Sequence, residues 1–344
     1  MSEVPDGAHT GTPDQAPARA PVRPSVRTSV RTRAHALDDV LVVDVGGTGT
    51  RLSALRDGVP LSVFDTFDSR RFDRGDEPAH RVLAARVREF ATAHALTPGA
   101  LVVGVPGMLD ERRERVSHCN NIRAFEGTGL LRGLRAELGV PVLLEQDTML
   151  QLLGEHRNGV ARDVDSVFGV YFGTGIGSAW LQGGDPFVPR SACQQAGHIP
   201  VGTEGRACRC GKRDCIEAYT SGHTLEALSR THGVPIGQLF ERHEDAILEQ
   251  SLQRFVTWQG FLLATIATLL EPDTIVVGGG IPGMSGYPRQ RLLDTVANQL
   301  QSSCTFGVER LRFATLGERA PAFGAQALVD IVGASASAAV PDPS

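Results

Sequence analysis

Four side chains that bind metals gather in one short, glycine-rich stretch of the chain, residues 197–217. They are His198, Cys208, Cys210 and Cys215. Three thiolates and one imidazole form a soft donor set that suits tetrahedral Zn²⁺. Scattered buried thiols or a disulfide pair are the alternatives, but three of the six cysteines would not usually crowd around one histidine by chance. Because no protein ligand is missing from the set, we predict a structural zinc that fixes the loop.

A carboxylate follows a short apolar run near the middle of the chain. Residues 140–144 are predicted as a strand, Asp147 comes shortly after it, and a helix is predicted over 149–158. In an α/β protein, the carboxyl end of a strand is a usual place for catalytic chemistry. Capping the N-terminus of the helix is the alternative role for Asp147.

Three glycine-rich turns follow apolar runs of the kind that buried strands show. They cover residues 44–51, 173–178 and 278–280. Glycine lets backbone N–H groups come close to phosphate oxygens. The first turn lacks the spacing of a P-loop, and no helix follows it directly. One such turn is a weak signal, since glycine-rich hairpins are common. Three of them predict a nucleotide that the backbone holds from both sides of a cleft.

The elements that must position these residues alternate between strands and helices, which is typical of an α/β chain. The first two glycine turns each join two predicted strands, so the sequence indicates an internal duplication. Further strands are predicted over 100–105 and 274–277, and helices over 78–96, 130–138, 224–232, 235–242 and 245–270.

Composition limits the classes of function. The chain has 344 residues, 41% of them hydrophobic and 21% charged, with a formal net charge of −5. This balance indicates a globular protein and gives no reason to expect nucleic acid or an anionic membrane as a partner. No apolar run is long enough to span a membrane, and no secretory signal is recognisable. Because the thiols are expected to bind metal, we predict a cytoplasmic location.

Length predicts two domains, with tails at both ends. Residues 1–37 are rich in Pro, Ala, Ser, Thr and Arg and are predicted as a disordered tail, although their arginines could also form a nucleic-acid-binding arm. An N-terminal α/β domain is predicted over 38–150 and a C-terminal one over 151–333. The low-complexity stretch 334–344 is predicted as a second disordered tail.

Together these motifs resemble one family. A Gly-His pair followed by Cys-x-Cys-Gly-x-x-x-Cys-x-Glu, with three glycine turns in this order over residues 39–330, is similar to the ROK family of sugar kinases and sugar-responsive repressors. The resemblance implies an actin-like ATPase (ribonuclease H-like) fold, with two domains around a cleft for nucleotide and sugar. It also implies ATP as phosphoryl donor, Mg²⁺ as cofactor, structural Zn²⁺, and a homodimer.

The resemblance also implies roles for individual residues. Asp147 would be the general base that takes the proton of the sugar 6-hydroxyl. Asp44 would help to place Mg²⁺ through water. The expected sugar-binding residues are Gly107, Asn121, Asp147, Gln195, His198 and Glu217. The expected nucleotide-binding residues are Asp44, Gly46, Gly47, Thr48, Thr50, Arg51, Thr174, Gly175, Gly278, Gly279 and Gly280.

Within the family, several local runs are most similar to D-allose kinases. They are residues 146–152, 197–202, 238–240 and 271–288. Two positions depart from the family pattern, because Gln195 replaces a glutamate and Met149 replaces an asparagine. The expectation is therefore a kinase for D-allose, with glucokinase, an N-acetylhexosamine kinase or a catalytically weak sugar sensor as alternatives. A DNA-binding repressor is not favoured, since the short N-terminal stretch shows no helix-turn-helix pattern.

Overall fold

The computed structural model describes residues 39–75, 77–127, 129–188, 195–202 and 204–338. The predicted tail 1–37 and its arginines lie outside these residues. The first half of the chain forms a five-stranded sheet in the order β3-β2-β1-β4-β7, in which β1 pairs antiparallel with β2 and parallel with β4. Its strands are β1 (Asp39–Val45), β2 (Gly49–Arg56), β3 (Val59–Asp68), β4 (Pro98–Val105) and β7 (Val142–Gln146).

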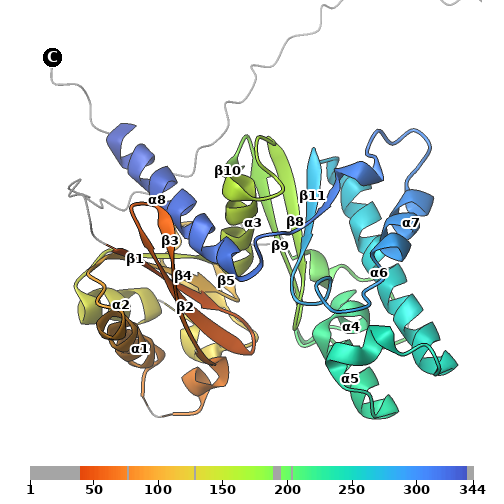
Figure 1. Cartoon of the computed structure of the whole chain (residues 1–344), viewed down its shortest axis with the longest axis horizontal. Coiled ribbons are helices and arrows are strands. Elements are labelled where there is room, and N and C mark those ends of the chain that lie inside the picture. Colours follow the sequence, from red (N-terminus) through yellow and green to blue (C-terminus); the bar gives the residue numbers. More distant parts are fainter. Residues whose placement is uncertain (1–38, 76, 128, 189–194, 203, 339–344) are drawn as a thin grey trace, which may run out of the picture.

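The second half builds a sheet with the same plan, in the order β10-β9-β8-β11-β12. An antiparallel hairpin again precedes the parallel strands. The internal duplication predicted from the two glycine turns is therefore confirmed, and Figure 1 shows the two sheets on either side of the molecule. The strands are β8 (Ser166–Phe172), β9 (Ile176–Gln182), β10 (Asp185–Pro186), β11 (Thr274–Gly278) and β12 (Leu311–Phe313). A small hairpin, β5 (Met108–Leu109) with β6 (Val116–His118), stands apart from both sheets.

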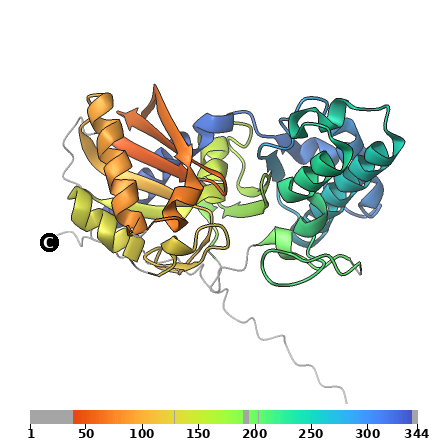
Figure 2. The same cartoon turned by 90° about the horizontal axis from the view of Figure 1, so that it is seen from below.

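Helices cover the outer faces of the two sheets. Figure 2 shows α1 and α2, orange to yellow, over the first sheet, and the green-to-blue helices gathered in the other half. The bounds are α1 (Ala79–Ala93), α2 (Gly129–Leu138), α4 (Glu217–Thr220), α5 (Gly222–His232), α6 (Ala246–Leu270) and α7 (Arg289–Gln299). The apolar α6 begins where the sequence predicts, because the side chain of Asp245 caps it by accepting from the N–H groups of Ile247 and Leu248.

Two helices lie between the sheets and join the halves. α3 (Asp147–Asn158) contacts strands of both sheets, and α8 (Ala320–Ala338) packs against α3 and against β1 and β2. The two helices approach closely because each has a glycine at the contact. A Cβ at Gly154 would lie 2.1 Å from the carbonyl oxygen of Ala320, and one at Gly324 would lie 1.8 Å from that of Leu150. A side chain at either glycine would push the helices apart.

Two local predictions need correction. The helix α8 continues to Ala338, so the first part of the stretch predicted as a C-terminal tail is helical. Alanine is the best helix former, which explains why a low-complexity alanine-rich end extends the helix. Residues 339–344 lie outside the described residues. The predicted helix over 235–242 is a 3₁₀ helix, η4 (Ile236–Glu241).

The remaining short elements are also 3₁₀ helices. They are η1 (Ser69–Asp73), η2 (Arg123–Phe125), η3 (Ala196–His198), η5 (Val308–Arg310) and η6 (Gly317–Arg319). Within the described part of the chain, no helix combines the length and the apolar character needed to cross a bilayer.

Candidate active site

One cleft of about 820 Å³ collects the residues that the sequence singled out. It is lined by all three glycine turns and by every candidate sugar-binding residue. The lining includes Asp44, Gly46, Gly47, Thr48, Thr50, Arg51, Gly107, Asn121, Asp147, Thr174, Gly175, Gln195, His198, Glu217, Gly278, Gly279 and Gly280. These residues come from both halves of the chain, so only the folded chain brings them together.

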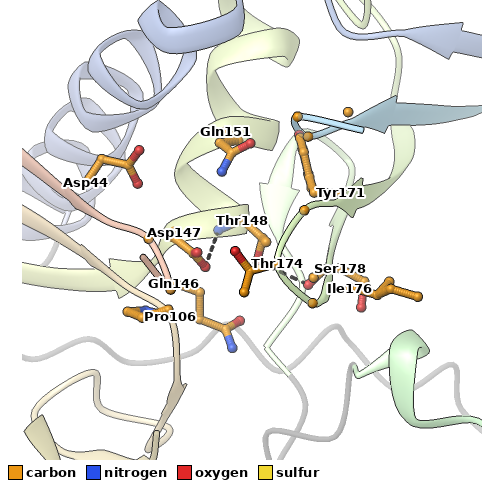
Figure 3. A pocket seen from close by; sticks show the side chains of 18 of the residues that line it. Asp44, Pro106, Gln146, Asp147, Thr148, Gln151, Tyr171, Thr174, Ile176 and Ser178 are labelled. Atoms are coloured by element: carbon orange, nitrogen blue, oxygen red, sulfur yellow. Dashed lines mark hydrogen bonds between the residues drawn. The ribbon is translucent and has the colours of Figure 1, made fainter. Parts of the chain in front are cut away.

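Asp147 lies on the cleft wall as the first residue of α3, directly after β7 (Figure 3). It is not the helix cap, because Gln146 occupies that position and makes no capping bond with its side chain. The Nε2 of Gln146 donates instead to the carbonyl oxygen of Gly107 at 3.1 Å. The Oδ1 of Asp147 accepts from the N–H of Thr148 at 2.8 Å. The residue lines the cleft.

Two of the carboxyl groups in the cleft, those of Asp147 and Asp44, differ in acidity. Burial, and then the nearby negative charge of Asp44, raise the pKa of Asp147 to about 8. Burial also raises the pKa of Asp44, to about 6, although the positive charge of Arg51 opposes the shift. As the pH rises, Asp44 therefore loses its proton before Asp147 does, and near neutral pH it is the charged group of the pair. A carboxyl group with a pKa near the working pH suits proton transfer.

The first glycine turn is held in place around Asp44. Asp44 and Arg51 face each other across the hairpin of β1 and β2, with Nη1 and Oδ2 3.9 Å apart. A second carboxylate, on Glu318, pairs with Nη2 of Arg51 at 2.5 Å. The hydroxyl group of Thr50 lies 3.0 Å from that of Ser69, which donates to the carbonyl oxygen of Gly46 at 2.9 Å. The hydroxyl group of Thr50 thus steadies the turn.

At two positions in the glycine turns, a Cβ atom would come too close to neighbouring atoms. A Cβ at Gly47 would lie 3.1 Å from Nδ2 of Asn121 and 3.5 Å from the Cβ of Thr174. The first turn, the candidate sugar-binding asparagine and the second turn therefore meet at one point. Gly279 has a φ of 92°, and a Cβ there would lie 2.3 Å from the carbonyl oxygen of Phe172. Only glycine fits this position without strain.

The predicted metal ligands converge in the structure. The ligand atoms of His198, Cys208, Cys210 and Cys215 all lie within 4.8 Å of one another. Nδ1 of His198 is 3.6 Å from Sγ of Cys208, and the Sγ atoms of Cys210 and Cys215 are 3.7 Å apart. In a tetrahedral zinc site, neighbouring nitrogen and sulfur ligands lie roughly 3.6–3.8 Å apart. The donor set and its spacing therefore fit Zn²⁺.

The disulfide alternative does not apply to this cluster. Its cysteines are free, and a sulfur separation of 3.7 Å is far longer than the roughly 2.05 Å of a disulfide. Burial raises the pKa of the Cys208 and Cys215 thiols. At Cys210, burial is outweighed by hydrogen bonds from the Lys212 N–H and the neighbouring thiols, which lower its pKa. Of the three thiols, that of Cys210 is thus the easiest to deprotonate.

The sequence did not predict several of the residues that line the cleft. Gln151 and Glu155 follow Asp147 at one-turn intervals along α3, a spacing that could have placed them on the same face. The fully buried Glu155 accepts from the N–H groups of Thr315 at 2.9 Å and Leu316 at 2.8 Å. It thereby fixes the segment that leads from β12 to α8. No local signal predicts this partner, because the segment is remote in sequence.

A buried tyrosine also lines the cleft. Tyr171, at the end of β8, is only 5% exposed, and its hydroxyl group has no hydrogen-bond partner among the described residues. Burial raises its pKa well above the ordinary value, and the charge of Glu155 adds to the shift. The hydroxyl group therefore stays protonated and remains a donor.

Comparison with known proteins gives a consistent result. The profile of the ROK family matches residues 40–331. An N-acetyl-D-glucosamine kinase of Salmonella dublin is 24% identical over 299 residues, covering 80% of this chain and 95% of the relative. The crystal structure of a ROK hexokinase from Thermus thermophilus is 27% identical, with a TM-score of 0.69, and covers 86% of this chain and 99% of that one.

A second solved structure supports the same fold. It is a ROK family glucokinase from Streptomyces griseus in complex with glucose and AMPPNP, 23% identical, with a TM-score of 0.67. The match covers 85% of this chain and 99% of that chain. The predicted fold class, two α/β halves of the actin-like ATPase type, is confirmed by this likeness and by the sheet topology.

Proposed function

Because the chain belongs to the ROK family, we propose that it is an ATP-dependent sugar kinase that transfers a phosphoryl group to the 6-hydroxyl of a hexose. One observation carries the proposal. Asp147 lies in a single cleft whose walls hold the three glycine turns and all the candidate sugar-binding residues. A base, a phosphate-binding backbone and a set of hydroxyl-binding side chains are the parts that phosphoryl transfer to a sugar needs.

The proposed roles of the cleft residues follow from their positions. Asn121, His198 and Glu217 hold the sugar hydroxyl groups, and Asp147 accepts the proton of the 6-hydroxyl. The oxygen of that hydroxyl bonds to the γ-phosphorus while the bond from the γ-phosphorus to the β,γ-bridging oxygen breaks and ADP leaves. The N–H groups of the first two glycine turns hold the phosphates in line with that oxygen. Most of the catalysis then comes from positioning and from neutralised charge.

Two metals complete the proposed site. Asp44, ionised near neutral pH, would help to place Mg²⁺ through water, and the metal would neutralise charge on the phosphates. His198, Cys208, Cys210 and Cys215 would hold Zn²⁺ in a purely structural role. Because Nδ1 of His198 is the nitrogen nearest Cys208, Nε2 is left for a sugar hydroxyl. The metal would fix the histidine that contacts the sugar.

Different observations support different hexoses as the substrate. D-allose is supported by the local sequence runs and by Gln195, which lines the cleft where the family has a glutamate. Two of the proteins named above are an N-acetyl-D-glucosamine kinase and a glucokinase, which makes these two sugars the second candidates. No relative named above is a D-allose kinase, so D-allose stays a prediction.

A coupled assay of ATP turnover with a panel of hexoses tests the proposal. The panel contains allose, glucose, mannose, fructose and N-acetylhexosamines, and the product's phosphate position is read by NMR. We expect turnover with at least one aldohexose and phosphate on O6. ATP turnover with none of the sugars, from folded and metal-loaded protein, would leave a catalytically silent sugar sensor as the better interpretation.

The homodimer expected from the resemblance and the cytoplasmic location predicted from the cysteines remain predictions. Light scattering of the purified protein tests the first. Fractionation of the source cells tests the second.

A further inference from the structure

The nucleotide end of the cleft contains an aromatic ring that no sequence motif indicated. The parallel strands β11 and β12 end side by side, with Val277 paired to Phe313. The N–H of Ala314 donates to the carbonyl oxygen of Val277 at 2.9 Å. Phe313 therefore stands next to the third glycine turn, at the carboxyl edge of the sheet. Ligands of open α/β sheets bind at this edge.

A guanidinium group lies on this ring. The Cζ atom of Arg289, the first residue of α7, is 4.5 Å from the centre of the Phe313 ring. Its Nη2 donates to the carbonyl oxygen of Pro282 at 3.3 Å, which limits its rotation. Within the described part of the chain, Arg289 forms no ion pair with a carboxylate. The side chain is exposed and lines the cleft, so the planar group is open to a ligand on the side away from the ring.

We propose that Arg289, supported by Phe313, is the surface on which the purine base of the phosphoryl donor stacks. The inference rests on the proposed kinase function and names the residues that recognise the base. A guanidinium group is planar, delocalised and weakly hydrated, and it stacks on aromatic faces. With a phenyl ring on one side and a purine on the other, Arg289 would form the middle layer of a three-layer stack.

The surroundings of the stack determine how selective it can be. Of the cleft residues near it along the chain, Gly280, Pro282, Gly283 and Ala314 have no side-chain donor or acceptor for the edge of a base, whereas Thr315 has a hydroxyl group. Stacking tolerates different bases because every base has a π-face. The stack itself therefore does not distinguish the two purines, and we expect ATP and GTP to bind with similar affinity.

Titration calorimetry tests the stack with three probes, namely MgATP, MgGTP and magnesium tripolyphosphate, which has phosphates but no base. We expect Arg289→Met to weaken both nucleotides roughly tenfold, the effect of losing one stacking contact, and to leave tripolyphosphate unchanged. Arg289→Lys keeps the charge but loses the plane, so it weakens the nucleotides almost as much. Phe313→Leu removes the supporting ring and has the same effect to a smaller extent.

The matched control is Arg291→Met, because Arg291 is also on α7 and lies outside the cleft lining. It leaves all three affinities unchanged. Equal loss of tripolyphosphate and ATP in Arg289→Met would show that Arg289 acts on phosphate charge, and unchanged ATP affinity would show mere surface packing. Either result overturns the inference, as does a wild type that binds ATP more than a hundredfold better than GTP.

A wild type that binds none of the probes would overturn the kinase proposal itself, whereas binding of tripolyphosphate alone would overturn only the base site.

Discussion

The N–H group of Ile176 donates a 2.8 Å hydrogen bond to Oε2 of Glu217. Ile176 lies in the second glycine turn, and Glu217 comes two residues after the last cysteine of the metal loop. The other carboxylate oxygen of Glu217 lies 3.7 Å from Sγ of Cys208. One side chain thus contacts the turn proposed to bind phosphate and the loop proposed to bind zinc. Changes at the metal are expected to reach both sugar and nucleotide.

Removing a metal ligand should therefore weaken sugar binding. Metal analysis of the wild type is expected to give about one Zn²⁺ per chain. Cys210→Ser should lose that zinc and raise the KM for the hexose roughly 10–100-fold, because His198 and Glu217 lose their support. Cys304→Ser, which changes a free cysteine outside the cluster, is the control. Full zinc content in Cys210→Ser would rule out the assigned ligand set.

Asp147→Asn should abolish transfer and leave nucleotide binding intact. The amide keeps the shape of the side chain but cannot accept the proton, and loss of a general base costs roughly 10²–10⁴-fold in rate. Single-turnover kinetics and nucleotide titration measure the two effects separately. Asp57→Asn, at an exposed turn, is the control. Near-normal turnover in Asp147→Asn would assign Asp147 a structural role only.

The rate should follow the ionisation of Asp147. Its raised pKa of about 8 means that the folded, ligand-free protein keeps this carboxyl group protonated near neutral pH. The value of kcat/KM should rise about tenfold per pH unit below that pKa and level off above it, since this ratio reports the free enzyme. The residual rate of Asp147→Asn should not show this rise. An identical profile in the variant would assign the titration to another group.

The same carboxyl group should reduce stability at higher pH. The unfolded chain ionises Asp147 near 3.8, whereas the folded chain ionises it near 8. Between these values the folded state holds the extra proton, so wild-type stability falls as pH rises. Asp147→Asn removes this loss. The free energy of unfolding of the variant, relative to that of the wild type, should therefore increase between pH 3.8 and about 8 and then stay constant. Urea denaturation at several pH values, with Asp57→Asn as control, measures it. An advantage that shrinks with pH would contradict the buried-acid explanation.

Gln195 should influence which hexose is preferred. An amide donates and accepts, so it suits a different arrangement of hydroxyl groups from the one a carboxylate serves. We expect the wild type to favour allose over glucose, and Gln195→Glu to shift the ratio of the two kcat/KM values roughly tenfold towards glucose. Gln301→Glu makes the same charge change at an exposed site outside the cleft. A wild type that prefers glucose, with a ratio indifferent to Gln195→Glu, would remove the D-allose assignment.

The sequence by itself determined those features whose cause is local. Apolar runs ending in glycine predicted β1, β8 and β11, because burial and freedom at φ are properties of a few adjacent residues. The cluster of His198 with three cysteines was predictable because the cysteines lie close together in the chain and their donor chemistry is specific. The family pattern then placed Asp147, Asn121 and Gln195 on one cleft before any distance was known.

Only the tertiary structure decided which distant residues meet. Glu155 bonds to Thr315 and Leu316, Arg51 pairs with Glu318, and Arg289 lies on Phe313. Each contact joins residues on separate elements, and neither partner belongs to a motif that specifies the other. The contacts of Glu155 and Arg51 arise because α8 and the segment before it return from the end of the chain to pack against α3 and the first sheet. The contact of Arg289 with Phe313 arises where β12 pairs with β11. Close approach at Gly154 and Gly324 allows α8 to pack against α3. Gly154 approaches Ala320 and Gly324 approaches Leu150, so each glycine and its partner lie far apart in the sequence.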